Sequence, residues 1–376
     1  MTYGLYIHIP FCEQHCHYCA FPVAVLPGAS HAPYVRRLIR ELQLGDLPDS
    51  IDTLYLGGGT PSLVDSDLIS ELVEATPPGA GEITIEANPG TLNDEKPRIY
   101  RELGINRISL GAQSFDSDDL RRAGRLHGPE DTIEDFEALR TAGFANINLD
   151  LIAGLPGQQR LAWQDNLDWI ERLEPDHVSI YLLEAEDSSL WGNRKPAMHA
   201  DDDHAWFYQA AAARLDRAGY VHYEVSNWAL PGRESRHNRS YWTGDSYRGF
   251  GLGAHSFIAD RRFWNTKSMD QYARRLDRGE LPVEQVEDRT RTIRLEEIFL
   301  LGLRRMEGFN TRTIAKELGI DYPQDWFERI HNLQEARLVE FDGTILKLAP
   351  SGWLLATGIT EELLCPTLLS TCEATP

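Results

Sequence analysis

The chain has 376 residues, of which 37 are Lys or Arg and 58 are Asp or Glu, so its formal net charge is −21. With 42% hydrophobic and 25% charged residues it is typical of a globular protein, and its length suggests two domains. The charge argues against nucleic acid or an anionic membrane as partner, because both bind clustered Lys and Arg. No apolar run long enough to span a membrane and no secretory signal is visible, so we expect a cytoplasmic protein.

Short apolar strands alternate with helical stretches over residues 1–230. Strands are predicted at 5–9, 53–56, 83–86, 107–110, 147–151, 178–182 and 221–225. Helices are predicted at 34–44, 65–75, 93–103, 129–142, 161–173 and 201–218. This alternation implies parallel strands joined by right-handed crossovers, and it fits a full or partial (β/α) barrel better than a doubly wound sheet. In either architecture the site forms at the C-terminal ends of the strands.

The rest of the chain follows a different pattern. Residues 231–289 include a Gly-rich and aromatic-rich stretch and are expected to connect two domains. Residues 290–364 predict three helices and then two strands at 338–341 and 345–348, joined by a hairpin turn at 342–344. This order resembles a winged helix, and the acidic balance favours a packing or partner-docking module over a DNA reader. Residues 365–376 are expected to form a loose tail.

Three of the five cysteines, Cys12, Cys16 and Cys19, form a C-x3-C-x2-C run directly after the first strand. An odd number of cysteines crowded in this way does not suit a disulfide framework. Three thiolates in one loop can wrap around a soft metal. One interpretation is zinc, which normally takes four protein ligands, with His8, His15 or His17 as the fourth. The other is a [4Fe-4S] cluster with one open iron. Two further cysteines on the tail are expected to be bystanders, Cys365 and Cys372.

Five short sequence motifs lie around these cysteines and the later strands. They are Tyr6-Ile7-His8-Ile9-Pro10-Phe11-Cys12, Gly57-Gly58-Gly59-Thr60-Pro61-Ser62, Leu110-Gly111-Ala112-Gln113-Ser114-Phe115, Asp150-Leu151-Ile152-Ala153-Gly154-Leu155-Pro156-Gly157 and His237-Asn238-Arg239-Ser240-Tyr241-Trp242. Together with the cysteine run they resemble the radical S-adenosylmethionine (radical SAM) superfamily. Within it they look like the oxygen-independent coproporphyrinogen III oxidase group, and most like its heme chaperones. The resemblance covers nearly the whole chain.

The resemblance implies a partial (β/α) barrel of the radical SAM type, with the small C-terminal domain of that group. It implies that Cys12, Cys16 and Cys19 hold a [4Fe-4S] cluster. It also implies that Gly58, Gly59 and Thr60 hold the methionine part of S-adenosylmethionine. Other positions that contact this cofactor in the family are Tyr6, Tyr18, Glu86 and His255. Four more match positions that contact a second cofactor molecule in the oxidase, Gln113, Arg125, Asp150 and Leu182. Whether one or two molecules bind stays open, as does the alternative that these are structural polar groups at strand ends. No catalytic residue is assigned.

The HNxxYW word matches the heme-binding members of the group. It implies heme contacts from His237, Asn238, Tyr241 and Trp242, since a His can ligate heme iron and aromatic faces pack on the macrocycle. Two departures weigh against the oxidase itself. Its fourth cysteine is replaced by Phe21, and only eleven residues precede Cys12 where the oxidase has an N-terminal extension. Oxidase activity is therefore not expected.

The resemblance thus predicts a radical SAM heme chaperone that binds the cluster, S-adenosylmethionine and heme. Its expected partners are acceptor hemoproteins, including membrane respiratory complexes, and a reductant such as a flavodoxin or ferredoxin. A homodimer is left open. One alternative is a two-SAM radical enzyme, either a porphyrinogen decarboxylase or a methyltransferase. Another is a structural zinc protein with an interaction module.

Overall fold

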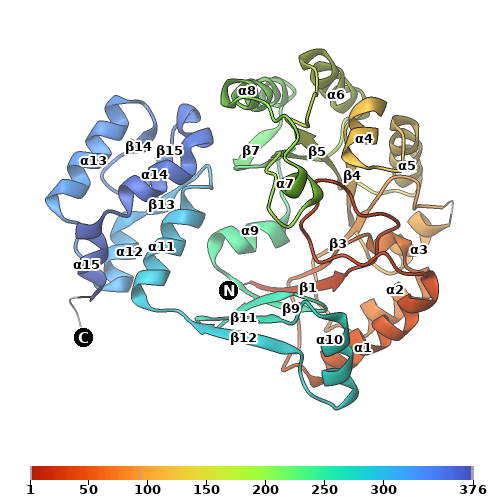
Figure 1. Cartoon of the computed structure of the whole chain (residues 1–376). Helices are drawn as coiled ribbons and strands as arrows, with labels where there is room; N and C mark the ends of the chain where they lie inside the picture. Colours follow the sequence, from red (N-terminus) through yellow and green to blue (C-terminus); the bar gives the residue numbers. More distant parts are fainter. Residues whose placement is uncertain (1, 94, 374–376) are drawn as a thin grey trace.

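The computed structural model describes residues 2–93 and 95–373. Its main sheet has twelve strands, and six neighbouring ones pair in parallel and in chain order. These are β1 (Tyr3–Ile9), β2 (Thr53–Gly58), β3 (Glu82–Ala87), β4 (Arg107–Gln113), β5 (Ile147–Ala153) and β6 (His177–Leu182). Figure 1 shows them curving into an unclosed barrel. The expected partial (β/α) barrel is confirmed.

Helices cover the outer face of this barrel (Figure 1). They are α1 (His31–Leu44), α2 (Ser66–Glu74), α3 (Lys96–Glu102), α4 (Ser117–Ala123), α5 (Pro129–Thr141), α6 (Arg160–Leu173) and α8 (Asp201–Arg217). Alternate strand residues such as Leu5, Ile7 and Ile9 are fully buried in the apolar core. Burying such side chains supplies most of the free energy that stabilises a fold of this kind.

The inner face of the barrel is polar. In β2 to β6, pairs of alternate residues carry polar side chains, as in Thr53 and Tyr55, Thr84 and Glu86, Arg107 and Ser109, Asn148 and Asp150, and His177 and Ser179. Parallel strands covered on both faces are normally apolar throughout. This alternation therefore indicates that the barrel interior is lined by polar side chains and is not a purely apolar core.

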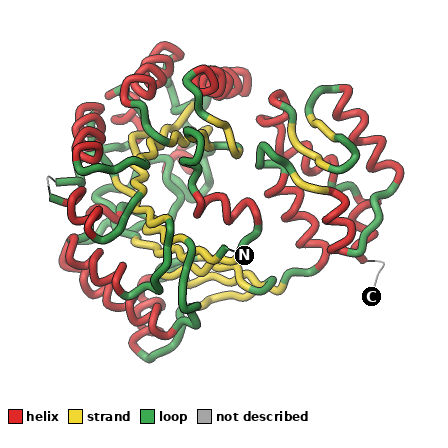
Figure 2. The backbone as a smooth tube through the Cα atoms, turned by 180° about the vertical axis from the view of Figure 1, so that it is seen from behind, coloured by secondary structure: helices red, strands yellow, loops and turns green. Residues whose placement is uncertain are grey.

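Residues 231–289 continue the same sheet beyond β1. After β7 (Val221–Glu224) and β8 (Asn227–Ala229) come α9 (Arg236–Thr243), β9 (Ser246–Phe250), β10 (His255–Ile258), β11 (Arg261–Asn265), α10 (Met269–Asp277) and β12 (Val283–Asp288). Strand β9 pairs in parallel with β1, and β10 to β12 follow antiparallel (Figure 2). The segment expected to connect two domains thus supplies four strands of the barrel sheet.

A fully buried carboxyl group joins α1 to this added segment. Glu41 accepts hydrogen bonds from the backbone N–H of Gly251 (2.9 Å), the Asn265 side chain (2.6 Å) and the Tyr272 hydroxyl (2.6 Å). Burial raises its pKa from 4.5 to about 7, because a charged carboxylate is poorly solvated there.

This pKa predicts how stability depends on pH. The folded pKa of Glu41 lies above its unfolded value, so the folded chain keeps a proton that the unfolded chain loses as pH rises from about 4.5 to 7. The contribution of Glu41 to the free energy of unfolding is full below that window and is lost through it. We expect Glu41→Gln to flatten the fall in unfolding free energy between pH 5 and 8 by about 2–3 kcal/mol, measured by urea unfolding. Equal slopes in the two proteins would contradict this.

The C-terminal module follows the order of a winged helix. It runs through α11 (Arg291–Gly302), β13 (Phe309–Asn310), α12 (Thr311–Leu318), α13 (Gln324–Glu335), β14 (Val339–Phe341) and β15 (Ile345–Leu348), and then α14 (Ala356–Leu363) and α15 (Pro366–Glu373). The expectation of a loose tail is wrong for residues 366–373. They form a helix, because Cys365, Leu368 and Cys372 are buried in the module core.

Backbone hydrogen bonds join this module to the barrel edge. The Val225 N–H donates to the Arg304 carbonyl (3.0 Å), and the Met306 N–H donates to the Tyr223 carbonyl (3.2 Å). Strand β7 is the last strand of the sheet on this side. Residues 304–306 therefore cover its open edge. Within the described residues no helix is both long and apolar enough to cross a membrane.

Candidate functional site

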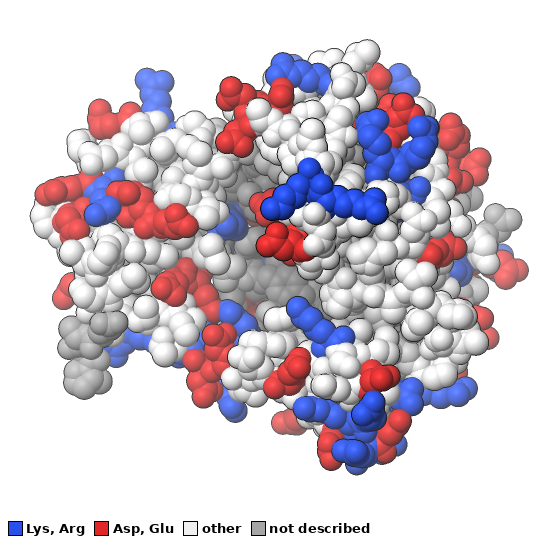
Figure 3. Space-filling view, viewed as in Figure 1, with Lys and Arg blue, Asp and Glu red and all other residues white. Residues whose placement is uncertain are grey.

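A cavity of about 650 Å³ opens at the C-terminal ends of the barrel strands. The barrel supplies its floor and one wall, and the C-terminal module adds Arg304, Trp353, Leu354, Ala356 and Thr357. In the space-filling view the surface is hollowed between the module and the barrel (Figure 3). This is the end of the strands at which the sequence predicted a site.

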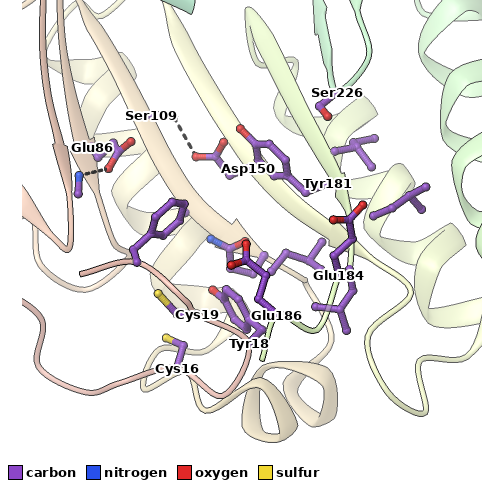
Figure 4. A pocket seen from close by; sticks show the side chains of 18 of the residues that line it. Cys16, Tyr18, Cys19, Glu86, Ser109, Asp150, Tyr181, Glu184, Glu186 and Ser226 are labelled. Atoms are coloured by element: carbon purple, nitrogen blue, oxygen red, sulfur yellow. Dashed lines mark hydrogen bonds between the residues drawn. The ribbon is translucent and has the colours of Figure 1, made fainter. Parts of the chain in front are cut away.

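The loop after β1 places the three cysteines at this cavity. Cys12, Cys16 and Cys19 are half-buried and all line it, and Figure 4 shows the last two side by side. Backbone bonds fix the loop at two points, from the Cys12 N–H to the Ala24 carbonyl (3.1 Å) and from the His17 N–H to the Ala123 carbonyl (3.0 Å). The thiols therefore stand on a loop that is held by its own later residues and by the end of α4.

The donor set fits a cluster bound by thiolates. The three thiols face one cavity from separate positions on the loop, which suits a cluster whose irons take one thiolate each. Arg125 donates to the Cys16 sulfur (3.6 Å) and brings a positive charge to it. Burial raises the pKa of Cys12 to about 11, so metal binding must supply the stabilisation of its thiolate. Among the residues described, no three His, Cys, Asp or Glu side chains enclose a single metal ion.

Two of the histidines near the loop make hydrogen bonds to other groups of the chain. His8 uses both ring nitrogens, bonding the Tyr6 hydroxyl (3.0 Å) and the Pro22 carbonyl (2.9 Å). His17 bonds the Arg122 carbonyl through Nδ1 (2.7 Å). His8, as it stands, therefore has no free lone pair for a zinc ion.

The glycine turn after β2 packs directly on the cysteine loop. A Cβ atom on Gly59 would lie 2.6 Å from the Phe11 carbonyl oxygen, and one on Gly58, whose φ is +120°, would lie 2.6 Å from the His8 ring. Only glycine allows so close an approach. Next to them, the Thr60 hydroxyl accepts a bond from Asn88 (2.8 Å) and lies 3.6 Å from the Cys12 sulfur.

Two half-buried carboxyl groups form part of the cavity floor (Figure 4). Glu86 accepts bonds from the Gly58 N–H (2.9 Å) and the Tyr55 hydroxyl (2.8 Å), and Asp150 accepts one from the Ser109 hydroxyl (2.9 Å). Burial raises the pKa of Glu86 to about 7 and also raises the pKa of Asp150. Both groups can bind a cationic or hydroxyl-bearing ligand above them.

Eight of the residues predicted to contact S-adenosylmethionine line this one cavity. They are Tyr18, Gly58, Gly59, Glu86, Gln113, Arg125, Asp150 and Leu182. Gln113 does so in a left-handed conformation (φ 65°), beside a shift in the pairing of β4 with β5. Three predicted contacts are not among the lining residues. Tyr6 bonds His8 and contacts the Tyr55 ring (centroids 6.1 Å apart), Thr60 is buried, and His255 is on β10, stacked on Trp264 (centroids 5.2 Å apart).

The sequence interpretation missed several lining residues, including Tyr55, Asn88, Ser109 and Tyr181. Tyr55, Ser109 and Tyr181 occupy inward positions of β2, β4 and β6. The polar alternation in neighbouring strands was the signal that could have found them. The module residues Arg304 and Trp353 carry no local signal, because their place in the wall depends on how the two domains pack.

The HNxxYW residues lie on α9, which Figure 1 shows beside the start of β1. His237 is only 1% exposed, and its ring nitrogens bond the Thr53 hydroxyl (2.8 Å) and the Tyr241 hydroxyl (2.8 Å). Asn238, Tyr241 and Trp242 are half-exposed. The sequence left the ligand of heme iron open, and His237 is not free for that role here, because its ring is enclosed and both nitrogens are hydrogen-bonded.

Comparison with known proteins agrees with these features. The radical SAM superfamily model matches residues 6–170, and the HemN C-terminal domain model matches residues 290–355. The heme chaperone HemW of Lactococcus lactis is 32% identical over 368 residues, which cover 96% of each chain. That of Mycobacterium tuberculosis is 34% identical over 380 residues, covering 96% of this chain and 95% of the relative. That of Escherichia coli is 39% identical over 266 residues, 68% of this chain and 70% of the relative.

A solved structure shares the fold. The coproporphyrinogen III oxidase HemN of Escherichia coli, described as a radical SAM enzyme, superposes with a TM-score of 0.83. The match covers 96% of this chain and 90% of that chain at 23% sequence identity. With the cysteine loop, the glycine turn and the C-terminal module in place, the chain belongs to the HemW heme chaperone family of the radical SAM superfamily.

Proposed function

We propose that this protein is a cytoplasmic heme chaperone that binds a [4Fe-4S] cluster, S-adenosylmethionine and heme, and transfers heme to respiratory hemoproteins. The observation that carries the cofactor part is the convergence of three cysteines, the glycine turn and two half-buried carboxyl groups on one cavity. The heme part rests on the family to which the chain belongs.

Each part of the cavity has a defined task in this proposal. Cys12, Cys16 and Cys19 hold the cluster, and Arg125 balances their negative charge. Gly58 and Gly59 let the backbone approach the methionine part of the cofactor, and Glu86 and Asp150 accept hydrogen bonds from its ammonium group and its ribose hydroxyls. When bound, cluster and cofactor supply one-electron cleavage of the sulfonium. The walls exclude water from that chemistry.

Heme contact is assigned to the outer face of α9. Asn238 and Trp242 are one helical turn apart and half-exposed, so they share a side of the helix that a macrocycle can reach. The electron comes from a reductant such as a flavodoxin or ferredoxin, and the acceptors include membrane respiratory complexes.

Hemin titration of the anaerobically reconstituted protein tests the chaperone proposal. We expect one heme per chain with a shifted Soret band, followed by loss of that band when an apo-hemoprotein is added. The Trp242→Ala variant should weaken heme binding by about fivefold, since stacking on one aromatic face contributes about 1 kcal/mol. Absence of stoichiometric binding by the unaltered protein would refute the proposal.

A second candidate is a radical enzyme that uses two S-adenosylmethionine molecules. It draws support from Gln113, Arg125, Asp150 and Leu182, which all line the same cavity as the glycine turn. Equilibrium dialysis separates the candidates, because two molecules bound per cluster favour the enzyme and one favours the chaperone. Iron and acid-labile sulfide without zinc would exclude the structural zinc alternative.

A further inference from the structure

The HNxxYW helix lies beneath the cavity, at the opposite end of the barrel strands from the cysteine loop. His237 bonds Thr53, the first residue of β2, and fits over Gly4 near the start of β1. A Cβ atom on Gly4 would stand 3.2 Å from the His237 ring. The imidazole is therefore packed into the N-terminal end of the barrel interior.

A continuous line of contacts leads from this imidazole to the glycine turn. The His237 ring stacks on the Tyr55 ring, with centroids 5.1 Å apart and an interplanar angle of 29°. The Tyr55 hydroxyl donates to one oxygen of Glu86 (2.8 Å), and the Gly58 N–H donates to the other (2.9 Å). Tyr55, Glu86 and Gly58 all line the cavity. His237 thus supports the cavity floor from below.

Strand β3 fixes both ends of this line. The Glu82 carboxylate accepts bonds from the backbone N–H groups of Arg236 (2.9 Å) and His237 (2.9 Å) at the start of α9. A carboxylate at a helix N-terminus is favourable because it meets the unpaired N–H groups and the positive end of the helix dipole. Glu86 lies four residues further along the same strand. The position of α9 and that of Glu86 are therefore set by one strand.

We propose that His237 is a positioning residue for the S-adenosylmethionine site and not a ligand of heme iron. It holds the Tyr55 ring so that the Tyr55 hydroxyl orients Glu86 against the Gly58 N–H. A neutral imidazole offers one lone pair, and here a neighbouring hydroxyl takes it. This inference rests on the proposed S-adenosylmethionine site. It assigns His237, the buried histidine of the HNxxYW motif, to the S-adenosylmethionine site instead of to heme.

The test compares cofactor affinities of the cluster-loaded full chain. We expect His237→Ala to weaken S-adenosylmethionine binding about tenfold and to require correspondingly more cofactor to shift the electron paramagnetic resonance spectrum of the reduced cluster. Heme stoichiometry and Soret position should stay unchanged. Tyr55→Phe removes only the hydroxyl that donates to Glu86. It therefore tests the contact between Tyr55 and Glu86 even if His237→Ala fails to fold.

The double variant, His237→Ala with Tyr55→Phe, shows whether the two residues act on the cofactor site through one another or independently. If His237 acts through Tyr55, the His237→Ala and Tyr55→Phe losses will not add. Arg239→Ala is the matched control, because this exposed residue is on the same helix and its side chain points to Glu307 (3.6 Å). Full cofactor affinity in both single variants, additive losses, or loss of heme in His237→Ala with cofactor affinity kept would overturn the inference. Failure of the unaltered protein to bind S-adenosylmethionine would instead refute the proposed function.

Discussion

Cys16→Ala is expected to abolish the iron–sulfur cluster and, with it, all binding of S-adenosylmethionine to iron. The three thiols on the loop after β1 are the ligands that the cavity offers a cluster, and Cys16 is the one that Arg125 contacts. With two thiolates left, the cluster loses a third of its protein ligands and is open to solvent. Iron and sulfide content, the absorbance near 400 nm and cofactor cleavage after anaerobic reconstitution measure the loss.

Cys365→Ala is the matched control for this experiment. Cys365 is also a free, buried thiol, but it lies in the C-terminal module and does not line the cavity. We expect full cluster content and a modest fall in stability of about 1 kcal/mol from the small void. Full cluster content in Cys16→Ala, or loss of the cluster in the control, would show that the ligands are assigned wrongly.

Gly59→Ala is expected to lower S-adenosylmethionine affinity by about 100-fold. The added methyl group would stand 2.6 Å from the Phe11 carbonyl oxygen and 2.7 Å from the Pro10 backbone, so the glycine turn and the cysteine loop must separate. A misplacement of about 1 Å in an active site can cost on the order of 100-fold in rate, and we expect a loss of similar size in affinity here. The crowding should also destabilise the fold by about 1–3 kcal/mol. Isothermal titration of the cluster-loaded protein and urea unfolding report the two effects separately.

Substitutions of two other glycines serve as controls for Gly59→Ala. A Cβ atom on Gly28 meets nothing within 4 Å, so Gly28→Ala should leave affinity and stability unchanged. Gly57→Ala would press on the Tyr55 and Glu86 side chains instead of on backbone atoms and should give an intermediate loss. Equal affinities for Gly59→Ala and Gly28→Ala would mean that the turn does not contact the cofactor.

Much of the barrel was predictable, because its strands and helices are defined by local patterns. The expected strand at 178–182 and helix at 129–142 differ from β6 and α5 by one residue. The cysteine spacing and the glycine turn also placed one end of the site. These features depend on residues close together in the sequence, which is why one sequence sufficed.

Long-range packing could not be predicted in the same way. The pairing of β9 with β1 joins residues about 240 positions apart, and no local pattern announces it. Likewise, His237 next to aromatic residues looks the same in sequence whether the ring faces a ligand or Tyr55. The helix at 366–373 was within reach, since Cys365, Leu368 and Cys372 repeat at helical spacing.

The covered edge of β7 has a consequence for the independence of the two domains. An uncovered edge strand exposes unpaired N–H and C=O groups, which recruit strands from other molecules and promote aggregation. In this protein the Tyr223 carbonyl and the Val225 N–H are bonded by residues 304–306 of the C-terminal module. A barrel severed from that module would therefore expose the β7 edge to strands of other molecules, so the module shields this edge as well as completing the cavity wall.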